Sequence, residues 1–116
     1  MPHVFYNAVI LTSTGQHIGT PDAWLDDVGL AIEVDSIAHH TSPTDFARTL
    51  ARNARYAAAG VPVLGVLPSD LIVRPAGVLH DVVAARTAAG ERVRPPVVLS
   101  RHESPSSGRL GWRWGA

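Results

Sequence analysis

The 116-residue chain contains no cysteine and no lysine, and each absence excludes a kind of chemistry. Without cysteine there is no disulfide, no thiolate nucleophile and no Cys-ligated zinc. Without lysine, the positive charge that a site needs must come from arginine or histidine. No apolar run approaches the ~20 residues that span a bilayer, and no basic-then-apolar leader opens the chain. We therefore expect a soluble cytoplasmic protein with no membrane partner.

The chain has no excess of charge of either sign, because ten arginines balance ten carboxylates and give a formal net charge of zero. This balance argues against strong unaided steering onto nucleic acid or acidic membranes. The apolar content of 46% is ordinary for a globular domain, and the length suits a single one. We expect residues 1–99 to form that domain and residues 100–116, rich in Ser, Gly, Arg and Trp, to form a flexible tail. Trp112 and Trp114 in this tail resemble a base-stacking patch, although a segment that docks through its tryptophans is the simpler interpretation.

The most informative stretch is residues 21–40. Its sequence pattern predicts two short strands joined by a tight turn at 26–29. Apolar and polar positions alternate along the second strand, as in a half-buried strand: Leu30, Ile32 and Val34 alternate with Ala31, Glu33 and Asp35. A turn with its tip at positions 27 and 28 places Asp22 across from Glu33, and such neighbours are roughly 5 Å apart. The pattern predicts that Asp22, Glu33 and Asp35 share one face of the sheet, with His39 and His40 just beyond the strand end.

These acidic and histidine side chains have two interpretations. A hard divalent cation such as Mg²⁺ or Mn²⁺ prefers oxygen ligands, and carboxylates on adjacent strands supply them. The alternative is a solvated sheet face that carries acidic residues by chance. His39 and His40 have two interpretations as well. One is a general base or a metal ligand, and the other is a pair of plain surface residues.

Strand signals continue on both sides of this stretch. Residues 8–12 and 16–19 predict a hairpin that leads into the strand at 21–25, giving an antiparallel meander. The apolar run 61–67 predicts a buried strand, reached from the meander by a right-handed helical crossover and therefore parallel within the same sheet. Residues 68–70 predict a turn, and residues 97–99 a short edge strand.

Two helices are expected to flank the sheet. Ser42, Pro43 and Asp45 form a dense start signal for the first, which ends near Ala59 before Gly60. A helical wheel places Phe46 and Leu50 of this helix toward the sheet. The second helix spans 76–89, with Val78, Leu79, Val82 and Val83 toward the sheet.

An arginine stripe lies on the opposite flank of the first helix, and it consists of Arg48, Arg52 and Arg55. Arginine suits bidentate phosphate contact, so the stripe fits nucleic-acid binding. The alternative is a solvent-facing helix side without a partner.

The order of these motifs resembles the PD-(D/E)xK nuclease superfamily, in particular its very-short-patch-repair-like endonuclease domains. The resemblance covers about residues 7–88. It is carried by Gly19-Thr20-Pro21-Asp22-Ala23-Trp24, by Glu33-Val34-Asp35-Ser36 with His39, by Arg52 eight residues before Gly60, and by Val63-Leu64 with Pro68. Actinobacterial domains of this type often form the C-terminal part of longer proteins grouped with type IV toxin–antitoxin regulators. The resemblance therefore implies an upstream winged-helix domain or a regulator as partner, besides DNA.

The resemblance implies an α/β fold of the restriction-endonuclease-like type, with a mixed sheet of four to five strands flanked by helices. It implies a metal-dependent DNA endonuclease, or a nuclease-derived domain, with Mg²⁺ or Mn²⁺ as cofactor. Asp22 and Glu33 match the metal ligands, and Asp35 stands at the position of the superfamily's lysine. His39 matches a water-activating histidine, and Arg52 matches the arginine that stabilises charge at the scissile phosphate.

The chain departs from this family in three places. It has no lysine, Ser36 replaces a frequent glycine, and no helix is expected before Asn7. One alternative is therefore a catalytically silent module of a regulator or toxin–antitoxin system that acts through DNA or protein binding. Another is a structural domain that forms a homodimer through its apolar sheet edge and its Trp tail.

Overall fold

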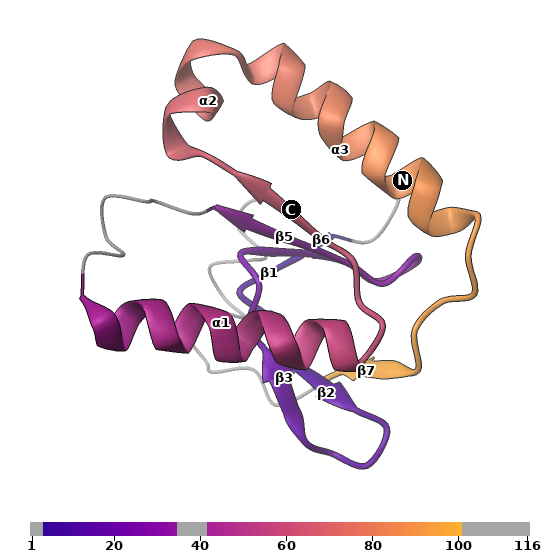
Figure 1. Ribbon diagram of the computed structural model, residues 1–116. Coiled ribbons are helices and arrows are strands. Elements are labelled where there is room, and N and C mark those ends of the chain that lie inside the picture. The colour runs from indigo at the N-terminus through magenta and orange to yellow at the C-terminus, as the bar shows by residue number, and fades with distance from the viewer. Residues whose placement is uncertain (1–3, 35–41, 101–116) are drawn as a thin grey trace.

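The computed structural model describes residues 4–34 and 42–100 (Figure 1). These residues form seven strands and three helices. In chain order they are β1 (Val4–Tyr6), β2 (Ile10–Thr12), β3 (His17–Gly19), β4 (Ala23–Leu25), β5 (Leu30–Val34), α1 (Pro43–Ala58), β6 (Val63–Val66), α2 (Pro68–Val73), α3 (Pro75–Gly90) and β7 (Val97–Leu99).

The strands form two sheets, and the larger one is mixed. Its order is β1-β4-β5-β6, with β5 and β6 parallel and the other neighbours antiparallel. The predicted α/β class, the hairpin around 26–29 and the parallel crossover through α1 are confirmed. Gly29, with a φ of +72°, closes the hairpin turn in the left-handed region that glycine adopts without strain.

The predicted single meander is wrong, because β3 pairs with β2 in a separate sheet of order β3-β2-β7. The buried Pro21 lies between β3 and β4 and has no backbone N–H to donate to a ladder, so the chain leaves one sheet before entering the other. The place beside β4 is taken by β1, a strand too short to show an alternating pattern.

Helices cover both faces of the larger sheet, with α1 on one side and α3 on the other (Figure 1). The alternation along β5 matches these two layers. Leu30 packs with Ala89 of α3, whereas Ala31 packs with Tyr56 of α1. Glu33, two residues after Ala31, lies on the face opposite Leu30, as the alternation predicts, and α1 covers this face.

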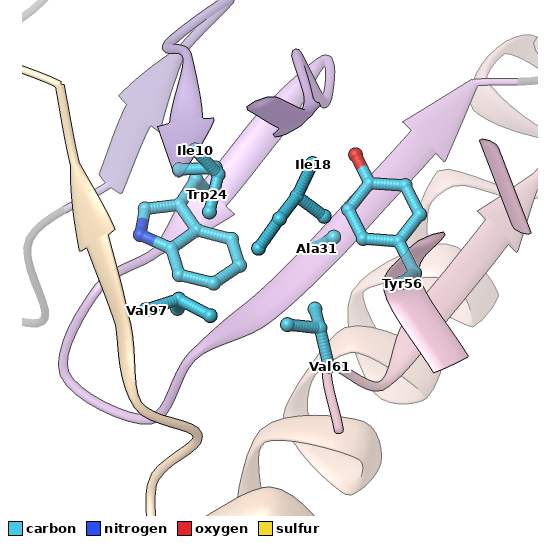
Figure 2. Close-up of a cluster of buried hydrophobic side chains, with 7 residues drawn as sticks. All are labelled: Ile10, Ile18, Trp24, Ala31, Tyr56, Val61 and Val97. Atoms are coloured by element: carbon cyan, nitrogen blue, oxygen red, sulfur yellow. The ribbon is translucent and has the colours of Figure 1, made fainter. Parts of the chain in front are cut away.

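A single apolar cluster joins the two sheets to α1 (Figure 2). Its buried members are Ile10, Ile18, Trp24, Ala31, Tyr56, Val61 and Val97. Each large apolar side chain buried in this way contributes about 1.5–3 kcal/mol. The cluster therefore fixes the position of α1 above β5, which matters for the site described below.

The predicted orientation of α1 is wrong. Phe46 and Leu50 are 57% and 53% exposed, whereas Tyr56 is 1% exposed and faces the sheet. The helical wheel places the apolar side chains toward the sheet, but a buried carboxylate on β5 gives polar side chains of α1 a partner in the interior. The start signal is confirmed, since the Ser42 hydroxyl accepts a hydrogen bond of 3.0 Å from the backbone N–H of Asp45.

The C-terminal half follows the sequence more closely. The second predicted helix is α3, and the predicted edge strand is β7, which pairs with β2. Of the four α3 residues predicted to face the sheet, Val78 is buried and Val82 half-buried, but Leu79 and Val83 are exposed. The predicted turn at 68–70 is the first part of a short helix, α2.

Arg94 anchors the segment that leads to β7. Its Nε donates to the backbone carbonyl of Asp26 at 2.8 Å, and one Nη donates to the Asp26 carboxylate at 2.9 Å. The same carboxylate accepts a hydrogen bond from the Trp24 indole. Across the described residues, no helix is both long enough and apolar enough to cross a membrane.

Candidate active site

Asp22 and Glu33 lie side by side at one end of the β4–β5 hairpin. Ala23 pairs with Ile32, so the same register continued by one residue places Asp22 opposite Glu33. The Asp22 carboxylate accepts a hydrogen bond of 2.6 Å from the backbone N–H of Val34, and its carbonyl accepts one of 3.2 Å from Asn7. Asp22 is thus held from the strands on both sides of β4.

Glu33 is a buried carboxylate, only 7% exposed. Its Oε2 accepts a hydrogen bond of 3.0 Å from the Tyr56 hydroxyl and lies 3.9 Å from Nε of Arg52. An isolated carboxylate is costly to bury, but hydrogen bonds and an opposite charge offset that cost. Helix α1 therefore supplies both a donor and a countercharge to the acidic face of the sheet.

Tyr56 is the site residue that the sequence reasoning missed. Burial raises the pKa of its hydroxyl above the usual range, and the neighbouring Glu33 carboxylate raises it further. The hydroxyl is therefore a stable hydrogen-bond donor at neutral pH. A Cβ on Gly19 would lie 2.5 Å from the Tyr56 oxygen, so this glycine leaves the room that the tyrosine needs. The sequence feature that indicates Tyr56 is its spacing, four residues after Arg52, in a helix made mostly of small and charged residues.

The predicted arginine stripe divides in the structure. Arg48 is exposed, whereas Arg55 donates from Nε to the carbonyl of Ile18 at 2.8 Å. The Arg52 side chain is 28% exposed and turns toward Glu33. Within the part of the chain that the structure describes, its buried Nε has no hydrogen-bond partner. DNA binding by these three residues stays a prediction.

An open cleft of about 390 Å³ lies beside Glu33, between the second half of α1 and the edge strand β6. Its lining consists of Glu33, Arg52, Asn53, Tyr56, Ala57, Val61, Val63 and Gly65. Gly65 pairs with Glu33 in the parallel register, and a Cβ there would meet no atom within 4 Å. The missing side chain at Gly65 therefore leaves Glu33 bordered by open space.

Three of the predicted site residues, Asp35, His39 and His40, lie outside the described residues, so their part in the site stays a prediction. Among residues 4–34 and 42–100, no group of three or more His, Asp or Glu side chains is gathered that could hold a metal ion. Asp22 and Glu33 provide two carboxylates. This donor set fits Mg²⁺, which proteins commonly bind through one or two carboxylates together with water and substrate phosphates.

Comparisons of the chain with models of protein families, with curated proteins and with solved structures found no match. The resemblance to PD-(D/E)xK nucleases therefore stays an expectation that rests on the motifs. The fold and the site define a mixed α/β domain in which a buried carboxylate, a tyrosine and an arginine border an open cleft.

Proposed function

We propose that this chain is a metal-dependent DNA endonuclease domain of the restriction-endonuclease-like type. Asp22 and Glu33 would hold Mg²⁺ or Mn²⁺, with Asp35 as a further ligand. The observation that carries the proposal is the placement of Asp22, directly before β4, opposite Glu33 of β5, with Arg52 of α1 3.9 Å from Glu33. Carboxylates and a guanidinium side by side suit a phosphodiester, whose charge needs a metal ion and an arginine.

Each side chain has a separate task in this proposal. A bound divalent ion would supply Lewis-acid polarisation of the phosphate and a more acidic water. Arg52 would stabilise the charge that develops on the phosphate oxygens, an electrostatic role that a fixed guanidinium suits. His39 would take the proton of the attacking water, since a histidine near its ordinary pKa of ~6.5 is partly neutral at physiological pH.

Arg52 also explains how the acidic pair is tolerated without an ion. Its guanidinium partly neutralises Glu33, so a metal ion and Arg52 compete for the same carboxylate. A bound ion would take over the neutralisation of Glu33 and would leave the Arg52 guanidinium wholly to the phosphate. Arg52 of α1 would in this way supply the positive charge that a lysine supplies in the nucleases that the motifs resemble.

A second candidate function is a catalytically silent module that binds DNA or a protein partner. The observation that favours it is the same network, because Tyr56 donates a hydrogen bond to Glu33 and Arg52 lies beside it as a countercharge, without a metal ion. A buried carboxylate that is hydrogen-bonded and partly neutralised in this way is tolerated without a ligand.

Metal binding separates the two candidates. Thermal unfolding of the purified chain should show a higher melting temperature in millimolar Mg²⁺ or Mn²⁺ than in chelator, since a ligand that binds only the folded state stabilises it by about 1.4 kcal/mol at ten times its Kd. Glu33→Gln should abolish the increase. Glu91→Gln, which changes an exposed carboxylate after α3, serves as the matched control and should retain it. Equal melting in metal and in chelator would favour the silent module.

A further inference from the structure

The cleft beside Glu33 is larger than a metal ion requires. A water molecule occupies about 30 Å³ of liquid, so an ion with a few waters fills only part of a cleft of about 390 Å³. Pockets that bind organic ligands measure roughly 300–1,000 Å³, and this cleft is at the small end of that range. It has room for one small organic group.

The walls of the cleft differ in chemistry. The side formed by β6 and the segment before it is apolar, with Val61 buried and Val63 40% exposed. The side formed by α1 is polar. It carries Arg52, whose side chain is 28% exposed and lies beside Glu33, and the exposed Asn53. The accessible part of a guanidinium favours a ligand that brings an acceptor, and an amide both donates and accepts.

We propose that this cleft binds one unpaired nucleotide. Its phosphate would accept from Arg52, and its base would lie between Ala57 and Val63, with the edge of the base on Asn53. An apolar wall accepts any base, since every base has a π-face, so the cleft tolerates sequence variation. The inference rests on the proposed function, because that function makes the nucleotide part of a DNA strand, and it specifies the substrate as DNA with an unpaired nucleotide.

The depth of the cleft selects an unpaired nucleotide over a stacked one. Glu33 is only 7% exposed, so a phosphodiester reaches it only if the strand enters the cleft between α1 and β6. A paired base inside a duplex is covered on both faces by its neighbours and on its edge by its partner, and it must leave the stack to enter such a pocket. The geometry therefore favours single strands, or duplexes with an extruded nucleotide.

Gly65 provides the decisive variant. In the parallel register Gly65 pairs with Glu33, so a side chain there projects into the cleft. Its backbone has no positive φ, and an added Cβ meets nothing within 4 Å. Gly65→Leu should therefore fold normally and fill the cleft. The matched control is Ala84→Leu, the same kind of enlargement at an exposed position of α3.

The test is a titration followed by backbone amide NMR shifts, in chelator, with three probes. These are a short oligothymidylate strand, a blunt duplex of two complementary strands and free thymidine monophosphate. The single strand should shift the amides of Asn53, Ala57 and Val63. Gly65→Leu should weaken its binding by about tenfold or more, the equivalent of ~1.4 kcal/mol, because the added side chain occupies the space of the base. Asn53→Ala should weaken it less, and Ala84→Leu should leave it unchanged.

The outcomes are distinct. If the strand binds much more tightly than the monophosphate, the nucleotide comes from nucleic acid; comparable affinities assign it to the free nucleotide, and both results support the cleft. The inference is overturned if Gly65→Leu binds the strand like the unchanged chain, if no probe shifts the cleft amides, or if only the duplex binds. Binding in the cleft by a protein that cleaves no DNA would refute the nuclease alone. Full cleavage by Gly65→Leu would refute the cleft alone.

Discussion

Tyr56→Phe is the sharpest test of the network that holds Glu33. The change removes one hydroxyl oxygen and leaves the ring, which packs between Ile18, Ala31 and Val61 in the core cluster. What is lost is the 3.0 Å hydrogen bond to Glu33. The effect on stability therefore reports this hydrogen bond and little else.

The magnitude follows from the burial of both partners. Tyr56 is 1% exposed and Glu33 7%, so water replaces the lost donor poorly. Hydrogen bonds to charged groups contribute about 1.5–3 kcal/mol, which places the expected loss near 2 kcal/mol. For a domain of this size, such a loss lowers the melting temperature by roughly 8 °C. Urea unfolding at neutral pH measures the free energy of unfolding directly, and the m-value should stay unchanged.

A double-mutant cycle makes the prediction refutable. In a Glu33→Met background the Tyr56 hydroxyl is buried without its acceptor, so Tyr56→Phe should be neutral or stabilising there. The coupling free energy between Tyr56 and Glu33 should be about 2 kcal/mol. If Tyr56→Phe costs the same in both backgrounds, the hydroxyl stabilises the fold through some other contact and the argument fails.

Three further predictions concern pH, Arg52 and Arg94. The pKa of Tyr56 is raised in the folded state, so its contribution to stability is complete below the unfolded pKa of ~10 and declines as pH rises above that value. Urea unfolding at alkaline pH should therefore show that the free energy of unfolding falls more steeply with pH for the unchanged chain than for Tyr56→Phe. Arg52→Gln removes the cation beside Glu33, so calorimetry should show Mg²⁺ affinity higher by about fivefold, the equivalent of ~1 kcal/mol, and unchanged affinity would exclude the competition. Arg94→Ala removes two hydrogen bonds to Asp26 and two to the backbone carbonyls of Pro95 and Val97, and it should lower the free energy of unfolding by about 2 kcal/mol. A loss under ~0.5 kcal/mol would show that these bonds add little to stability.

Local patterns of the sequence predicted the elements that depend on local chemistry. The alternation from Leu30 to Val34 placed β5 and the direction of Glu33, because side chains on a strand alternate between faces whatever the surroundings. Ser42 and Pro43 placed the start of α1, since capping satisfies backbone groups within a few residues. The turn at 26–29 and the parallel partner β6 followed from short-range rules as well.

The elements that the sequence mispredicted depend on contacts distant along the chain. The orientation of α1 is set by Tyr56 and Arg52 meeting Glu33, a choice that a helical wheel cannot represent. The division into two sheets is set by β7 pairing with β2 from the far end of the domain. The cleft exists because Gly65 has no side chain, and the sequence does not indicate that Gly65 lies beside Glu33.

Metal-dependent cleavage tests the central claim, that Asp22 and Glu33 form the active site of a nuclease. The measurement incubates the purified chain with single-stranded and duplex DNA in Mg²⁺, in Mn²⁺ and in chelator, beside Asp22→Asn, Glu33→Gln and the control Glu91→Gln. The account predicts cleavage that requires the metal ion, that disappears in Asp22→Asn and Glu33→Gln, and that persists in Glu91→Gln. Cleavage that survives Glu33→Gln, or an absence of cleavage of either DNA with either ion, would contradict it.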